Sequence, residues 1–294
     1  MPPFRNHVGT HRLRPRKYQS HVRAHEEVIN NKFWYGDDGP SLGRQFSASK
    51  MAERQQVVIE LLWKAAKKEE KAGNKKLAEE YGNLGDKLNA CSPRAHCGSL
   101  GCPPCARAFQ RAKVAAQDLL IAELAKKRTD RRLVFVSVIP KGMTYAPGQF
   151  SQIDIPKANR RLKVALKPIG MNRIMVGSAD LGWETRRGGK YIQLHWHLAM
   201  WTSNPTRLEK KLKSVFTPTK KYERPVDVTL TRDNGFLAYM SKGIKWPDLL
   251  RRNRTHIPEL LVALDRMDPL ELMVLRKLRL SAQHGRIAIR PIGN

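Results

Sequence analysis

The chain has 294 residues, 41% of them hydrophobic, which allows one large domain or two modest ones with a buried core. Its 55 Lys and Arg residues outnumber 26 Asp and Glu residues, and the formal net charge of +29 makes a nucleic acid the expected partner. No apolar run reaches the roughly 18 residues of a spanning helix and the first residues lack a secretory apolar segment, so we expect a cytoplasmic protein without a membrane partner.

The first 90 residues contain two regions of different character. Residues 1–45 are rich in Arg, His, Gly and Pro and show no helical period, which indicates a basic flexible arm, either phosphate-binding or simply disordered. From Ser47 to Ala90, two apolar stripes separated by Gly73 and Asn74 predict a pair of antiparallel helices.

All four cysteines lie in one short stretch: Cys91, Cys97, Cys102 and Cys105. Thiolates suit tetrahedral Zn²⁺, and the Cys-Pro-Pro-Cys turn can bring two sulfurs onto one ion. Disulfides are the alternative, but they are rare in the cytoplasm. Because the first pair is widely spaced, His96 is an alternative to one thiolate. We expect a closed structural zinc site within a helical segment that spans residues 46–130.

A helix is predicted from Ala106 to Lys127, directly after the cysteines. Its basic residues Arg107, Arg111 and Lys113 lie near the expected zinc site, and we predict that they contact DNA.

The next region alternates strands and helices. Leu133–Ile139 reads as a central strand, Pro156–Leu166 as a basic helix, and Arg173–Trp183 as the first strand of a hairpin whose second strand is Tyr191–Thr202. A helix from about 205 to 216 and a strand from about 225 to 230 follow.

The second hairpin strand carries two histidines on one face. Alternation places His195 and His197 together, opposite an apolar face that includes Trp196. A turn centred near Arg187 and Gly188 puts Asp180 opposite His195. Glu184 has the same parity, and a register slip or a bulge would make it the third ligand instead.

Two imidazoles and one carboxylate suit a catalytic divalent ion such as Mn²⁺ or Mg²⁺. The alternative is a pair of histidines without any ligand.

A later helix places Lys242 three residues after Tyr239, on the same helical face. A phenol is a poor nucleophile at neutral pH, so a cation that stabilises the phenolate or a phosphate is chemically useful. The alternative is a core tyrosine beside a solvated lysine.

The C-terminal region, residues 248–294, carries Arg251, Arg252 and Arg254, which we predict to bind DNA. An apolar period around Leu260 to Leu280 predicts a helix pair split at Asp268 and Pro269. We expect a basic helical appendage that recognises DNA, dimerises or packs against the sheet.

The order of a strand reading FVSVI, a strand reading LHWHLAMW and a helix reading AYMSK resembles the replication-initiator branch of the HUH endonucleases, the Rep proteins of rolling-circle plasmids. The cysteine cluster is similar to the metal-binding segment that precedes the nuclease core in a subset of them. The resemblance covers roughly residues 91–246. It implies that His195 and His197 bind the metal, that Tyr239 is the nucleophile and that Lys242 assists it.

This resemblance implies an α+β fold with a nuclease core over residues 131–247. The core would be a central antiparallel sheet of ferredoxin-like type, with helices on one face and the histidine face open to single-stranded DNA. The implied activity is nicking and rejoining of a replication-origin hairpin through a 5′-phosphotyrosyl link that leaves a 3′-hydroxyl primer.

The implied partners are single-stranded origin DNA, a host helicase and a DNA polymerase. A host helicase is expected because Gly189-Lys190 lacks the flanking residues of a phosphate-binding loop. Alternatives are an HUH transposase, a relaxase, or a non-catalytic, zinc-stabilised DNA-binding repressor.

Overall fold

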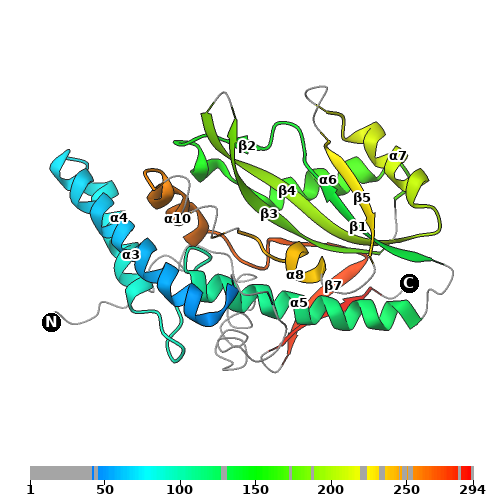
Figure 1. Ribbon diagram of the computed structural model, residues 1–294, viewed down its shortest axis with the longest axis horizontal. Helices are drawn as coiled ribbons and strands as arrows, with labels where there is room; N and C mark the ends of the chain where they lie inside the picture. Colours follow the sequence, from blue (N-terminus) through cyan, green and yellow to red (C-terminus); the bar gives the residue numbers. More distant parts are fainter. Residues whose placement is uncertain are drawn as a thin grey trace.

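The computed structural model describes residues 42, 46–126, 131–171, 174–186, 189–218, 224–231, 236–244, 246, 250, 254–283 and 286–292. Their architecture is α+β, with an antiparallel sheet at the centre and helices around it (Figure 1). The predicted class is therefore confirmed at this coarse level. Apart from Leu42, the basic arm predicted over residues 1–45 lies outside the described residues.

Helices α3 (Ala48–Lys71) and α4 (Lys75–Asn89) pack against each other, as the two apolar stripes predicted. The Ser47 hydroxyl caps α3 by accepting a hydrogen bond from the amide of Lys50. Gly73 joins the two helices with a φ of +80°, a left-handed conformation that glycine adopts without steric cost.

Helix α5 (Pro103–Lys126) follows the cysteines and is buried on most of its surface. It packs against α3, against α8 (Phe236–Met240) and against strand β8 (Arg286–Pro291). In Figure 1 it runs below the sheet as a long green helix. This position makes α5 the element that joins the cysteine segment to the sheet.

The central sheet has the strand order β5-β1-β4-β3-β6, and every pair along it is antiparallel. The short strand β2 pairs with β4 outside this path. The bounds are β1 Arg132–Val138, β2 Thr144–Tyr145, β3 Met175–Arg186, β4 Gly189–Thr202, β5 Val226–Leu230 and β6 Met273–Arg276. The predicted hairpin is β3 with β4, and the histidine strand lies in the middle of the sheet.

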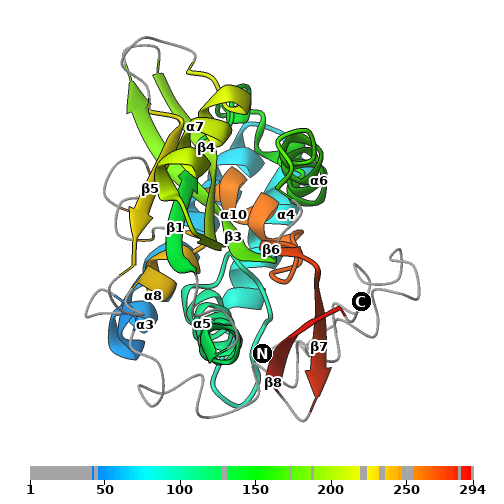
Figure 2. The same cartoon turned by 90° about the vertical axis from the view of Figure 1, so that its right-hand side faces the viewer.

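One face of the sheet is apolar and is covered by α6 (Ile155–Leu166) and α7 (Pro205–Val215). Trp196 anchors this layer: its Nε1 donates a hydrogen bond to Asn159 of α6 over 3.0 Å, and its ring contacts Phe216 at the end of α7. Both helices lie together beside the sheet in Figures 1 and 2.

The opposite face carries the histidines, and it is also partly covered. Phe236 of α8 contacts Phe135 of β1, and Lys113 of α5 reaches Ser178 of β3. The prediction of helices on one face only, with the histidine face open, is therefore wrong. Val176, Ala199 and Trp201 lie on the same face as the histidines and are buried. Their burial explains the second layer.

The C-terminal prediction is correct for one helix and wrong for the second. Helix α10 (Ile257–Asp265) is present, but residues after Pro269 form strands: β6 pairs with β3, and β7 (Leu278–Gln283) pairs with β8. An apolar run of this length fits either element, and the open edge of β3 selects the strand. Part of the predicted appendage thus belongs to the central sheet.

Within the described part of the chain, none of the helices combines the length and the apolar character needed to cross a bilayer.

Candidate functional site

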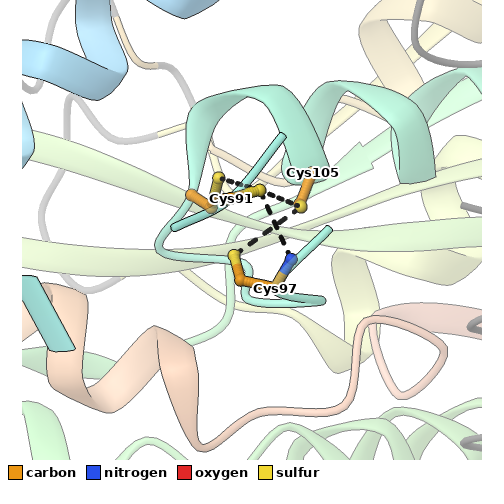
Figure 3. Close-up of side chains that lie close together, drawn as sticks. Cys91, Cys97 and Cys105 are labelled. Carbon is orange, nitrogen blue, oxygen red and sulfur yellow. Dashed lines mark hydrogen bonds between the residues drawn. The ribbon is translucent and has the colours of Figure 1, made fainter. Parts of the chain in front are cut away.

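The four cysteine side chains converge between the end of α4 and the start of α5, and none of them forms a disulfide. Figure 3 shows the sulfurs of Cys91, Cys97 and Cys105 turned toward one another. The Sγ atoms of Cys91 and Cys105 are 3.5 Å apart, and those of Cys97 and Cys105 are 3.7 Å apart. The Cys97 amide donates a hydrogen bond of 3.3 Å to the Cys91 sulfur, and this bond orders the loop between the two cysteines.

These distances fit coordination of a single ion. Four thiolates arranged tetrahedrally at the ~2.3 Å metal–sulfur distance of zinc proteins have sulfurs roughly 3.8 Å apart. Burial, with the neighbouring thiols, raises the pKa of the Cys102 thiol well above its ordinary value. Three of the four cysteines are buried and Cys97 is half-buried. A cation would make four thiolates favourable there, and the cluster could hold a metal.

A second group of possible metal ligands lies on the sheet: Asp180 of β3 with His195 and His197 of β4. Asp180 is directly opposite His195 in the strand register, as the hairpin turn predicted. One ligand atom from each of the three residues lies within 4.8 Å of the others. The group could therefore hold a metal ion.

Two neighbouring residues set the orientation of His197 and the space beside His195. Ser137 of β1 hydrogen-bonds Nδ1 of His197 over 3.0 Å, which turns Nε2 toward Asp180, 3.3 Å away. Gly182 leaves space beside His195, because a Cβ atom there would lie 3.2 Å from the imidazole Cε1.

Asp180 supplies a further sign that the group suits a cation. Its Oδ1 atom is buried and has no hydrogen-bond partner in the described part of the chain. A buried carboxylate oxygen without a partner is costly, and a divalent ion would compensate it.

Glu184, the alternative third ligand, lies apart from this group. It is opposite Tyr191, four residues along β3 from Asp180, and is half-buried. The register therefore places Asp180, and not Glu184, beside the two histidines.

Tyr239 lies over the histidine face. Its ring centroid is 4.9 Å from that of His197 and 5.8 Å from that of Phe135, and 51% of its surface remains exposed. A phenol that contacts a potential metal ligand and still faces solvent is accessible to a macromolecular substrate.

Lys242 connects the tyrosine to the carboxylate. Its ammonium nitrogen is 4.0 Å from the centre of the Tyr239 ring and 2.9 Å from Oδ2 of Asp180. Helix α8 ends at Met240, so Lys242 reaches this position from the turn after the helix rather than from the predicted helical face.

Opposite charges set the ionisation of this pair. Burial opposes the charge on Asp180, but its hydrogen bond with His197 and the Lys242 ammonium outweigh burial and hold the pKa of the carboxyl below its ordinary value. Burial also opposes the charge on Lys242, but Asp180 raises its pKa. The carboxylate is therefore ionised and the amine protonated at neutral pH.

The sequence did not indicate Lys113 as part of this site. Its side chain is buried, and its Nζ donates to the hydroxyl of Ser178, two residues before Asp180 on β3, over 3.4 Å. Burial lowers the pKa of Lys113 to about 8, although the charge of Asp180 opposes this shift. No periodicity in the sequence shows that α5 packs against β3.

Helix α5 also holds the tyrosine helix at two points. The Gln110 side chain donates to the Ala238 carbonyl over 2.9 Å, and the Ser241 hydroxyl donates to the Gln117 side chain over 2.6 Å. Tyr239 lies between these two contacts. The helix that begins at the cysteine cluster therefore supports the position of the phenol.

The predicted DNA-binding arginines and lysine of α5 are not on the surface. Arg107 donates to the Phe46 carbonyl over 2.5 Å, and only 5% of Arg107, none of Arg111 and 2% of Lys113 is exposed. Direct phosphate contact by these three residues is therefore not supported, and the prediction is wrong in this respect. Of the C-terminal group, Arg254 is exposed, whereas Arg251 and Arg252 lie outside the described residues.

Comparisons of the chain with family models, with curated proteins and with solved structures find no match.

Proposed function

We propose that the chain is a site-specific endonuclease and ligase for single-stranded DNA that initiates rolling-circle replication. The observation that carries this proposal is the position of Tyr239, an exposed phenol whose ring lies against both His197 and Lys242. A nucleophile, a cation and a set of metal ligands thus occupy one side of one sheet.

The donor sets favour different ions. Four thiolates are soft ligands and suit Zn²⁺ in a closed, structural site. Two imidazoles with one carboxylate suit Mn²⁺ or Mg²⁺, with coordination positions left for substrate oxygens. When bound, such an ion would supply Lewis-acid polarisation of the scissile phosphate.

The reaction that these residues support is a transesterification. The phenol oxygen of Tyr239 forms a bond to phosphorus, and the bond between phosphorus and the 3′ oxygen breaks. The phenol proton passes overall to the departing 3′ oxygen, so the products are a 5′-phosphotyrosyl link and a free 3′-hydroxyl. No water is consumed, and the reverse reaction rejoins the strand.

Lys242 would act on the charge that develops in this step. Its ammonium lies over the Tyr239 ring, where it can stabilise a phenolate or the extra charge on the phosphate. Asp180 keeps this amine protonated and fixes its direction. The interaction is stronger in the transition state than in the ground state, which is the condition for catalysis.

The surroundings of Tyr239 suit a single strand. Phe135 and Phe236 are half-buried beside it, and aromatic rings are the surfaces on which unpaired bases stack. We propose a single-stranded origin hairpin as the substrate, with a host helicase that unwinds the duplex and a DNA polymerase that extends the 3′-hydroxyl.

The test uses single-stranded DNA with a randomised segment, labelled at its 3′ end and incubated with Mn²⁺. The wild-type chain should form a labelled adduct that survives SDS, because the 3′ fragment retains the phosphotyrosyl link. DNA labelled at the 5′ end should instead give a shorter free product that a polymerase can extend.

Two variants make the test specific. Tyr239→Phe should abolish the adduct, whereas Tyr191→Phe, which changes a half-buried tyrosine on β4, should retain it. The absence of an adduct with the wild-type chain, together with sequence-specific binding to duplex DNA, would instead favour the non-catalytic repressor.

A further inference from the structure

Helices α6 and α7 carry a concentrated positive surface on the face of the sheet that lies away from Tyr239. Their exposed cations are Lys157, Arg160, Arg161 and Lys163 on α6, and Arg207, Lys210, Lys211 and Lys213 on α7. Glu209 is the one acidic residue in the two helices, and it is paired with Lys213. We call these eight cations the α6–α7 basic surface.

The cations share a helical face on each element. On α6, Lys157, Arg160 and Lys163 follow at intervals of three, and Lys167 continues the row beyond the helix end. On α7, Arg207 and Lys210 have the same spacing. The leucines of both helices, among them Leu162 and Leu212, are buried against the sheet.

The two rows are held next to each other. Helices α6 and α7 are in contact, and Lys211 donates to the Ile169 carbonyl just after α6 over 3.1 Å. Figures 1 and 2 both show the two helices on the same side of the sheet. Most of the cations form no ion pair with any other residue that the structure describes, and all eight are exposed to solvent.

We propose that the α6–α7 basic surface binds the phosphate backbone of duplex nucleic acid without sequence specificity. A helix of 12 residues is roughly 18 Å long at about 1.5 Å per residue. Each strand of a duplex has one phosphate per ~3.4 Å of the duplex axis, so a helix parallel to this axis spans about five phosphates of one strand. Packed helices lie about 8–10 Å apart, a separation comparable to the width of a groove between the two strands.

Single strands and membranes fit this surface less well. Binding of single strands relies on aromatic stacking, and neither helix contains an aromatic residue. Binding to an anionic membrane by amphipathic helices requires a free apolar face, which both helices use to cover the sheet. Val164 is one exposed apolar side chain on α6 and offers no such face by itself.

This surface goes beyond the proposed cleavage, because it does not depend on Tyr239 or on a metal. It would hold the duplex that flanks a single-stranded substrate, on the opposite side of the sheet from the phenol. The two proposals can therefore fail independently.

The test compares two chains that lose the same charge. One has Arg160→Gln, Lys163→Gln, Arg207→Gln and Lys210→Gln, and the control has four exposed lysines of α3 and α4 changed to Gln: Lys67, Lys68, Lys71 and Lys76. Fluorescence anisotropy measures binding to a duplex of about thirty base pairs and unrelated sequence over a range of salt concentrations.

The α6–α7 variant should bind the duplex at least ~10-fold more weakly. The negative slope of log K against log salt should decrease in magnitude by about 3. The control should bind nearly as the wild type does, and adduct formation on single strands should be unchanged in both. Equal losses in both variants, or none in either, would overturn the proposal. Loss of binding to phosphatidylserine vesicles with duplex binding retained would overturn it in favour of a membrane.

Discussion

The ammonium nitrogen of Lys242 lies 2.9 Å from Oδ2 of Asp180, and the same nitrogen lies 4.0 Å from the centre of the Tyr239 ring. One lysine therefore contacts both the carboxylate of the candidate metal group and the candidate nucleophile. Because these three residues come from β3, α8 and the turn after α8, the fold itself joins the two halves of the site.

Asp180→Asn should weaken Mn²⁺ binding by at least ~100-fold, because a neutral amide replaces the anionic ligand opposite His195. Adduct formation should fall by a factor of about 100 or more. Isothermal titration with Mn²⁺ and the rate of adduct formation measure the two effects. Glu184→Gln is the matched control and should change neither; the reverse pattern would make Glu184 the ligand.

Lys242→Gln should slow adduct formation by about 100-fold, since a charge aimed at the reacting oxygen is lost. The loss should persist at saturating Mn²⁺, which separates a direct effect on Tyr239 from an indirect effect on Asp180. Lys190→Gln changes an exposed lysine on β4 and should leave the rate unchanged. A Lys242→Gln chain with the wild-type rate would reduce this lysine to a structural partner of Asp180.

Lys113 should make the stability of the fold depend on pH. Its pKa in the folded chain is about 8, below the ordinary value, so above that pH the unfolded chain binds more protons and the free energy of unfolding rises with pH. The rise ends near the ordinary lysine pKa of about 10.4 and amounts to ~3 kcal/mol.

Urea unfolding at neutral pH and near pH ~10 measures this rise in the wild type and in Lys113→Met, which should lack it. Lys126→Met, at the exposed end of the same helix, controls for the loss of one positive charge. Identical pH dependence in the wild type and in Lys113→Met would contradict the assignment.

The cysteine cluster should bind one Zn²⁺ per chain, and cobalt substitution should give the visible absorption of tetrahedral thiolate coordination. Cys102→Ser should lose the metal and destabilise α5, whereas His96→Ala should retain it. Adduct formation should fall in Cys102→Ser, because α5 supports the Tyr239 helix through Gln110 and Gln117. Retention of zinc by Cys102→Ser but not by His96→Ala would show that the histidine is the fourth ligand.

Local patterns in the sequence were sufficient to predict most helices and strands and the central residues of the candidate site. The hairpin turn and the alternation of strand side chains predict that Asp180 lies opposite His195, because both depend on residues close in sequence. Tyr239 and Lys242 are also near each other in the chain, and their contact is confirmed, although through a turn rather than a continuous helix.

Contacts between distant segments could not be predicted in this way. The approach of Lys113 to Ser178 requires α5 to pack on the sheet, and the same packing buries Arg107 and Arg111. Residues 273–276 form a strand because β3 offers an open edge, a tertiary effect that an apolar period does not reveal. Helices α6 and α7 are also far apart in the sequence, so their contact could not be predicted from local patterns.

Peptide mapping of the SDS-resistant adduct tests most directly whether Tyr239 attacks DNA. After digestion with trypsin and nuclease, mass spectrometry should find the nucleotide on the peptide from Asp233 to Lys242, whose single tyrosine is Tyr239. A nucleotide on a peptide that carries any other of the 7 tyrosines, or a wild-type chain that forms no adduct, would contradict this role of Tyr239.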